Sequence, residues 1–240
     1  MSLIRSFPTS VLGNKNVSRE TLPIFHSEMF HVKHSGMTEL PPHIAEDFNR
    51  LKGDMLKTYP QEEIWSRLEL YTQTLVRWSG SINLVSRRDL STIATKHLRQ
   101  ALMMIPIVTG LRHKVIMDLG SGAGLPAIPM KAVLLDSHFI LVESRRKRAN
   151  FLRDVVRTVG LDGIDIINER VEHWAGWPGG VDLITARAVA SPDRLRDLVG
   201  GHLAPEGWIL SPLDRASSHN VARQWRIEED GVATSLGLYR

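Results

Sequence analysis

The chain has 240 residues, 42% of them apolar, which suits one large domain or one domain with an appendage. It contains no cysteine, which excludes disulfides, cysteine-based zinc sites and a thiol nucleophile and is compatible with the cytoplasm, where we expect the protein. The formal net charge of +4 permits a polyanionic partner without requiring one. The best apolar run, Ala101–Val108, is far too short to span a membrane, so no membrane contact is expected.

Residues 1–38 show no sustained hydrophobic period and are predicted to form a disordered tail. They mix Ser, Pro, Asn and Gly, and they lack the continuous apolar segment of a secretion signal. His26, His31 and His34 lie in this tail without the context of a folded site. We therefore expect no metal site there.

Residues 41–110 are predicted to form a helical N-terminal lobe. One helix is indicated by apolar residues spaced four, three, four and three apart, which share one face: Ile64, Leu68, Tyr71, Leu75 and Trp78. It begins with the acids after Pro60 and ends at Gly80. A second helix is expected from Ser91 to about Met104, before Pro106. For Trp78 and His97, composition alone favours packing within this lobe.

Residues 111–240 alternate between strand and helix patterns, which predicts an α/β domain with a doubly wound parallel sheet. The expected strands are Val115–Leu119, Phe139–Glu143, Ile164–Asn168, Val181–Ala186 and Trp208–Leu210. The expected helices are Ala127–Leu135, Arg145–Val159, which ends at Gly160, and Asp193–Leu203. Ligands of such sheets bind at the carboxyl ends of the strands.

The most informative stretch of the chain is a buried strand that runs into a glycine-rich turn. Asp118 is followed by Gly120, Gly122 and Gly124, and glycine is needed where a backbone approaches a ligand or adopts a positive φ. The next strand ends in Glu143, an acid placed to accept hydrogen bonds from a ribose diol. The pattern predicts a site for a nucleotide-type ligand, with a purely structural turn as the alternative.

The spacing of the glycines indicates which nucleotide is bound. Dinucleotide sites have G-x-G-x-x-G and a pyrophosphate over the third glycine. Here the spacing is G-x-G-x-G, and Leu125 occupies that third position. This turn favours a cofactor without a pyrophosphate, above all S-adenosylmethionine. A nicotinamide oxidoreductase remains the alternative, to be separated by cofactor titration.

Four segments resemble the small-subunit ribosomal RNA guanine-N7 methyltransferases of the RsmG (GidB) type. The resemblance covers about residues 60–210, including Trp78, the Asn83–Ser86 segment and His97 in the lobe. Its most specific part is the glycine turn with its two following prolines. The four segments are Asp118–Pro129, Glu143–Leu152, Arg170–Glu172 and Thr185–Ala190.

The resemblance implies a class I S-adenosylmethionine-dependent methyltransferase, with a Rossmann-like sheet, that acts on 16S ribosomal RNA or the small ribosomal subunit. It places Glu143 at the ribose, Val171 and Glu172 at the adenine, and Arg187 near both cofactor and substrate. The implied cofactor-binding set is Gly120, Gly122, Gly124, Leu125, Glu143, Val171, Glu172 and Arg187. Arg187 is the candidate catalytic residue, and a monomer is the default expectation.

A run of four basic residues, Arg145, Arg146, Lys147 and Arg148, follows Glu143 at the start of a predicted helix. Such a run is most often a solvated face. The alternative is that it binds RNA phosphates beside the cofactor, which predicts an affinity that falls steeply with salt.

Three departures from the family pattern bear on activity. Ala127 stands where the family usually has glycine, and Gln100 and Ala101 replace an Asp-Ser pair. The 210–215 segment has no Lys-Gly, and the remaining tail is expected to be too short for a closing strand pair. A non-catalytic RNA-binding relative and a methyltransferase for another substrate therefore stay open as alternatives.

Overall fold

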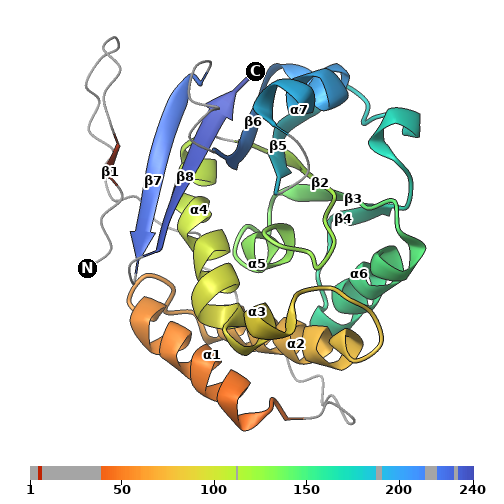
Figure 1. Ribbon diagram of the computed structural model, residues 1–240. Helices are drawn as coiled ribbons and strands as arrows, with labels where there is room; N and C mark the ends of the chain where they lie inside the picture. Colours follow the sequence, from red (N-terminus) through yellow and green to blue (C-terminus); the bar gives the residue numbers. More distant parts are fainter. Residues whose placement is uncertain (1–4, 7–38, 112, 188–190, 214–220, 230–231) are drawn as a thin grey trace.

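The computed structural model describes residues 5–6, 39–111, 113–187, 191–213, 221–229 and 232–240. They build one eight-stranded sheet in the order β1-β7-β8-β6-β5-β2-β3-β4 (Figure 1). Strands β2 to β6 run parallel, and β8 runs antiparallel to β6 and β7, which confirms a mainly parallel doubly wound sheet. The strands are β1 Arg5–Ser6, β2 Val115–Leu119, β3 His138–Val142, β4 Ile164–Ile167, β5 Val181–Ala186, β6 Leu203–Pro212, β7 Arg223–Glu229 and β8 Val232–Tyr239. Of the predicted tail, all but Arg5–Ser6 lies outside the described residues.

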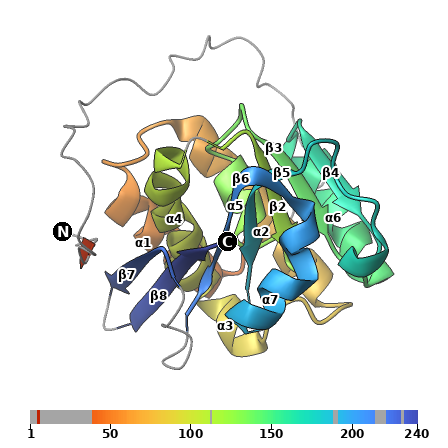
Figure 2. The same ribbon diagram turned by 90° about the horizontal axis from the view of Figure 1, so that it is seen from above.

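Helices cover both faces of this sheet. The α-helices are α1 Pro42–Met55, α2 Glu62–Ser79, α3 Arg87–Ser91, α4 Arg99–Gly110, α5 Ala127–Lys131, α6 Arg146–Val159 and α7 Pro192–Val199. A π-helix, η1 Ile93–Leu98, and two 3₁₀ turns, η2 Val171–His173 and η3 Gly200–His202, complete the set in the described part of the chain. Figures 1 and 2 both show β7 and β8 on one flank of the molecule and β4 with α6 on the other.

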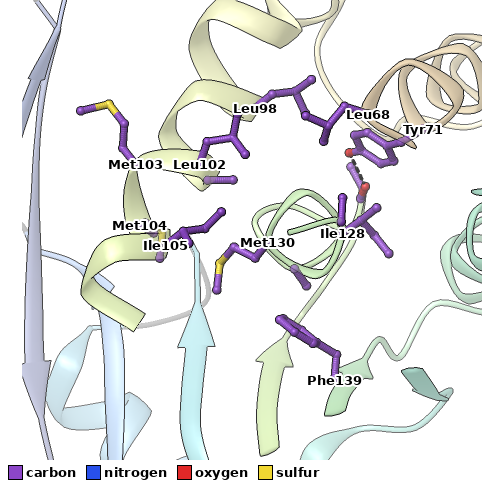
Figure 3. Packing of buried hydrophobic residues seen from close by; sticks show 14 of the residues in the cluster. Leu68, Tyr71, Leu98, Leu102, Met103, Met104, Ile105, Ile128, Met130 and Phe139 are labelled. Atoms are coloured by element: carbon purple, nitrogen blue, oxygen red, sulfur yellow. Dashed lines mark hydrogen bonds between the residues drawn. The ribbon is translucent and has the colours of Figure 1, made fainter. Parts of the chain in front are cut away.

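Alternate residues of each central strand point to opposite faces, as the two-residue period of a strand requires. Ile116 of β2 and Phe139 of β3 belong to a large core cluster with residues of α1, α2, α4, α5 and α6. Their neighbours Met117 and Ile140 belong to a smaller cluster with Val171 and residues of α7. The helices before the sheet therefore share one continuous core with it, part of which Figure 3 shows between α4 and β3.

The predicted helix from Ser91 to Met104 is wrong in its bounds, because α3, η1 and α4 occupy residues 87–110 and α4 continues through Pro106. Proline lacks the N–H that would bond to the carbonyl four residues earlier. That carbonyl, of Leu102, instead accepts a 2.7 Å hydrogen bond from the buried Tyr59 hydroxyl. A side chain from elsewhere thus supplies the donor that Pro106 removes, and the helix is not interrupted.

Two further helix predictions are too long. Helix α5 ends at Lys131 rather than Leu135, because the buried Lys131 ammonium donates 2.6 Å hydrogen bonds to the carbonyls of Leu135 and Ser137 and the chain turns around it. Helix α7 ends at Val199, and the two glycines that follow, which favour turns over helix, lie in η3. The C′ glycine of α6 is confirmed, since Gly160 has the left-handed φ of 70°.

The C-terminal end is longer and more ordered than expected. Strand β6 spans Leu203–Pro212 instead of the predicted Trp208–Leu210, because it pairs with β5 on one side and with β8 on the other. Strands β7 and β8 form the closing pair over seven registered residues each. The expectation that the tail is too short for this pair is therefore wrong.

Helix α1 anchors the π-helix through a buried carboxylate. Asp47 is 1% exposed, and its Oδ2 accepts hydrogen bonds from the backbone N–H groups of Ala94 (2.8 Å) and Thr95 (3.3 Å). Its Oδ1 accepts from the Thr95 hydroxyl. These donors lie in the first turn of η1, where no helical partner exists for them.

We expect Asp47→Ala to lower the free energy of unfolding by about 3 kcal/mol, because it leaves buried N–H donors unpaired. Urea denaturation followed by circular dichroism measures the change. Glu46→Ala is the control, since Glu46 lies on the same helix and is exposed. An Asp47→Ala variant as stable as the control would contradict this account of η1.

Candidate functional site

The glycine turn between β2 and α5 is bound to the end of the neighbouring strand β3. The backbone N–H groups of Gly120 (2.8 Å) and Ser121 (3.2 Å) both donate to the Val142 carbonyl. Gly120, Gly122 and Gly124 have φ values of 68°, 54° and 78°, which L-residues rarely adopt. At Gly124 a Cβ would also lie 2.6 Å from Cγ1 of Ile128. The turn thus requires glycine for its own conformation and for its packing.

Glu143 lies directly against this turn, as its position after the next strand predicts. Its carboxylate accepts a 2.9 Å hydrogen bond from the Gly122 N–H at Oε2 and a 2.8 Å bond from the Arg145 N–H at Oε1. The side chain is 4% exposed. Each carboxylate oxygen has two acceptor positions, so one on each oxygen remains for a ligand hydroxyl.

The end of β4 also reaches Glu143. The Asn168 amide donates to the backbone carbonyls of Glu143 (2.9 Å) and Ser144 (3.2 Å). The turn η2 follows three residues later, with Val171 buried and Glu172 exposed. Leu125 is partly buried and packs against the large core cluster. The structure thus brings Glu143 and the glycine turn into contact and places η2 after the adjacent strand.

Behind the turn lies a buried polar group centred on Asp118, which is 1% exposed. Its Oδ1 accepts a 2.7 Å hydrogen bond from the Thr185 hydroxyl of β5, and burial raises the pKa of this carboxyl to about 7. The backbone carbonyl of Asp118 also binds the glycine turn, by accepting a hydrogen bond from the Ser121 hydroxyl at 2.9 Å. The side chain joins β2 to β5.

Helix α2 holds the other side of the turn. The fully buried Tyr71 donates a 2.8 Å hydrogen bond from its hydroxyl to the Ala123 carbonyl, drawn as a dashed line in Figure 3. Burial raises the pKa of Tyr71, so the phenol stays protonated and remains a donor. Helical periodicity places Tyr71 among the apolar residues of one helix face and does not predict this hydrogen bond. The available signal was that a buried tyrosine hydroxyl requires a partner.

Arg187, at the end of β5, is bound by a histidine from the helical segment, which comprises α1 to α4 and η1 before the sheet. Its Nη2 donates to Nδ1 of His97 in η1 at 2.9 Å, so His97 is not confined to packing within the lobe. The other ring nitrogen of His97 lies 3.7 Å from Oδ1 of Asp89. Burial, together with the charge of Arg187, lowers the pKa of His97 to about 4. The imidazole is therefore neutral at pH 7 and can accept the bond.

The basic run divides into two parts. Arg145, Arg146 and Lys147 are exposed at the start of α6. Arg148 is partly buried and donates from Nη2 to the Asn83 carbonyl at 3.1 Å, and its Nη1 lies 3.6 Å from where a Cβ of Gly122 would be. Three of the four side chains therefore face solvent, and the fourth joins the glycine turn to the segment after α2.

Trp78 does not pack only within the helical segment. Its indole N–H donates to Asp154 of α6 at 2.8 Å, and its ring meets Phe151 edge-on at 6.0 Å. In the residues that the structure describes, no three His, Asp or Glu side chains gather so that they could hold a metal ion. His26, His31 and His34 lie outside those residues. No helix in the same part of the chain has the length and apolar character needed to cross a membrane.

We expect Tyr71→Phe to weaken binding of S-adenosylhomocysteine about fivefold, because the glycine turn loses a hydrogen bond worth about 1 kcal/mol. Isothermal titration calorimetry measures the affinity. Tyr59→Phe is a matched control, since Tyr59 also donates a buried hydroxyl to a carbonyl, within the helical segment. Both variants should lose similar stability, but only Tyr71→Phe should lose affinity. Equal affinities of the two variants for S-adenosylhomocysteine would show that α2 does not set the geometry of the turn.

Comparison with known proteins identifies the family. The family model for rRNA small subunit methyltransferase G matches residues 64–221. A ribosomal RNA small subunit methyltransferase G from Paramagnetospirillum magneticum is 35% identical over 182 residues, covering 74% of this chain and 86% of its own. The protein of that name from Sphingopyxis alaskensis is 34% identical over 203 residues, covering 81% and 86%. The chain therefore belongs to the rRNA small subunit methyltransferase G family and is a class I methyltransferase that uses S-adenosylmethionine.

Proposed function

We propose that the protein transfers the methyl group of S-adenosylmethionine to N7 of one guanine in 16S ribosomal RNA. The observation that carries this proposal is the contact between the glycine turn and Glu143, at the carboxyl edge of the sheet, in a chain of this family. The relatives are named for the RNA of the small ribosomal subunit, which supports RNA as the substrate.

The residues present fit the cofactor. Gly122 brings bare backbone next to the Glu143 carboxylate, since a Cβ there would lie 4.0 Å from this carboxylate. Glu143 has acceptor positions left for the ribose hydroxyls. We assign the adenine to Val171 and Glu172, and the methionine and adenosine side to Gly120 and Leu125. When bound, the cofactor supplies an electrophilic methyl group.

The reaction requires positioning rather than proton transfer. Guanine N7 carries a lone pair and no proton, so its methylation needs no general base. Alignment of a nucleophile at near-attack distance can lower a barrier by roughly 7–11 kcal/mol in favourable systems. Since the methylated base is cationic, a guanidinium next to N7 would oppose the reaction. We therefore assign Arg187, the proposed catalytic residue, to an anionic group, either an RNA phosphate or the cofactor carboxylate.

The division of the chain follows from these assignments. We propose a helical lobe over residues 41–110 and a methyltransferase domain over residues 111–240. We also propose that the protein acts as a monomer in the cytoplasm, where the ribosomal RNA is. Among the described residues, Leu56 is the single large apolar side chain that is exposed, at 41%, and stable interfaces generally need a larger apolar patch.

The test is methyl transfer from labelled S-adenosylmethionine to 16S RNA and to small subunits, both from cells that lack this modification. We expect label in 7-methylguanine after digestion to nucleosides, and at least a hundredfold loss with Arg187→Ala, which removes a charge-assisted contact that positions the cofactor or the RNA. Label in a different base or in protein would refute the proposed substrate. Cofactor binding without transfer to either form would favour a non-catalytic RNA-binding relative.

We further propose that Arg145, Arg146 and Lys147 bind RNA phosphates beside the cofactor, with Arg148 completing this basic surface next to the glycine turn. Their exposure supports this, and no ion pair within the described part of the chain involves the first three. Arg153 and Arg157 lie further along the same helix and are also exposed. They provide a control with the same charge.

The double variant Arg146→Gln/Lys147→Gln should reduce the slope of log affinity for 16S RNA against log salt by about one to two, as expected for two lost phosphate contacts. Arg153→Gln/Arg157→Gln, which removes equal charge, should leave the slope nearly unchanged. Filter binding between 50 and 300 mM salt, a range chosen to span roughly physiological strength, gives both slopes. Equal slopes for the two variants would mean that the run is only a solvated face.

A further inference from the structure

The hydrogen bond between Arg187 and His97 joins two segments that lie 90 residues apart in the chain. Arg187 ends β5, whereas His97 belongs to the π-helix of the helical segment. The His97 side chain is 14% exposed, so water competes little for the bond. The contact therefore fixes the position of one nitrogen of the guanidinium relative to the helices.

The direction of this bond follows from its chemistry. A guanidinium has donors and no acceptor, so Nδ1 of His97 must accept and the ring proton must lie on Nε2. The charged groups around the ring are Arg187 from β5, Asp89 from α3 and Lys96 from η1 itself. Asp89 lies on the Nε2 side and is held by hydrogen bonds from Ser86 and Lys96. The ring is thus held by a hydrogen bond at Nδ1, whereas Nε2 has no hydrogen-bond partner among the described residues and faces the Asp89 carboxylate at 3.7 Å.

The second terminal nitrogen of Arg187 is not used by the protein. Nη1 is buried and has no hydrogen-bond partner among the described residues. Oδ1 of the nearby Asp118 carboxylate accepts from Thr185, whereas its Oδ2 is buried without a hydrogen-bond partner, and within the described part of the chain no ion pair joins it to Arg187. A buried charged donor without a partner is costly, and such groups in native proteins commonly await a ligand. Arg187 lines a small pocket together with Thr185 and Pro126, which follows the glycine turn.

We propose that His97 is a positioning residue, which holds Arg187 through Nη2 so that Nη1 meets an anionic oxygen of the bound ligand. This oxygen belongs to a carboxylate of the cofactor or to an RNA phosphate. This proposal rests on the proposed function, because S-adenosylmethionine and RNA are the two ligands that the proposed function implies. The helical segment thereby contributes to ligand binding through His97, although His97 itself does not contact the ligand.

The test combines His97→Ala, His97→Gln, Arg187→Ala and the double alanine variant. Glutamine retains a carbonyl oxygen that can accept from Nη2, whereas alanine does not. Affinities for S-adenosylhomocysteine and for 16S RNA are measured by calorimetry and filter binding. 5′-Methylthioadenosine, which lacks the carboxylate, is the third ligand.

If Nη1 binds the cofactor carboxylate, His97→Ala should weaken S-adenosylhomocysteine about tenfold and leave 5′-methylthioadenosine unchanged, an effect within the range for a charge-assisted bond. If Nη1 binds phosphate, the loss should appear with RNA and not with S-adenosylhomocysteine. In either case His97→Gln should recover most of the affinity. His97→Ala should also have no further effect once Arg187 is alanine, because the two residues act as one unit.

Unchanged affinities for all three ligands in His97→Ala would overturn the proposal. So would additive losses in the double variant, or a glutamine variant as weak as alanine, because both indicate a general structural effect. These binding measurements need no turnover. If the wild type methylates neither 16S RNA nor small subunits, the proposed function fails. The binding measurements still test the role of His97 in that case.

Nuclear magnetic resonance gives a readout independent of any ligand. At pH 6, nitrogen-15 spectra of the histidine rings should show His97 neutral with its proton on Nε2. The pKa of His97 is lowered by burial and then by Arg187, so Arg187→Ala should raise it towards the ordinary value near 6.5. A protonated His97 at pH 6 in the wild type would be incompatible with the proposed bond.

Discussion

The site depends on a small set of backbone hydrogen bonds between the glycine turn and the end of β3. Two N–H groups of the turn share the Val142 carbonyl, and the next donates to the Glu143 carboxylate. These donors can converge on one strand end only because Gly120 and Gly122 adopt positive φ values. The conformation of the turn and the orientation of the Glu143 carboxylate are therefore a single constraint. A side chain at either glycine would disturb both.

Much of this part of the site can be predicted from sequence, because it is local. Strands β2 and β5 have the predicted bounds, and Glu143 lies where an acid after the next parallel strand should lie. The rest depends on contacts between distant residues. Tyr71 bonds to the turn 52 residues later, and no periodicity predicts which carbonyl a buried hydroxyl reaches. The continuation of α4 through Pro106 likewise depends on Tyr59, 43 residues before the carbonyl that it satisfies.

Two of the three departures from the family pattern come together in the folded chain. Gln100 lines the same pocket as Leu210 and Pro212, which belong to the segment without Lys-Gly. Its side-chain amide donates to the Thr234 hydroxyl of β8 at 3.0 Å. The charged residues that the family usually has at both places are thus absent from one small region, where neutral groups pair instead. The altered C-terminal end keeps its closing strands, and α4 contacts β8 through this neutral pair.

The helical segment makes one contact with each part of the proposed site. Tyr71 of α2 binds the glycine turn, His97 of η1 binds the end of β5, and the Asn83 carbonyl accepts from Arg148 at the start of α6. Each is a directional hydrogen bond that constrains orientation more than the shared apolar core can. The core explains why the helices stay on this face of the sheet. The three bonds explain how they can set the geometry of the carboxyl edge of the sheet, where the glycine turn and Glu143 lie.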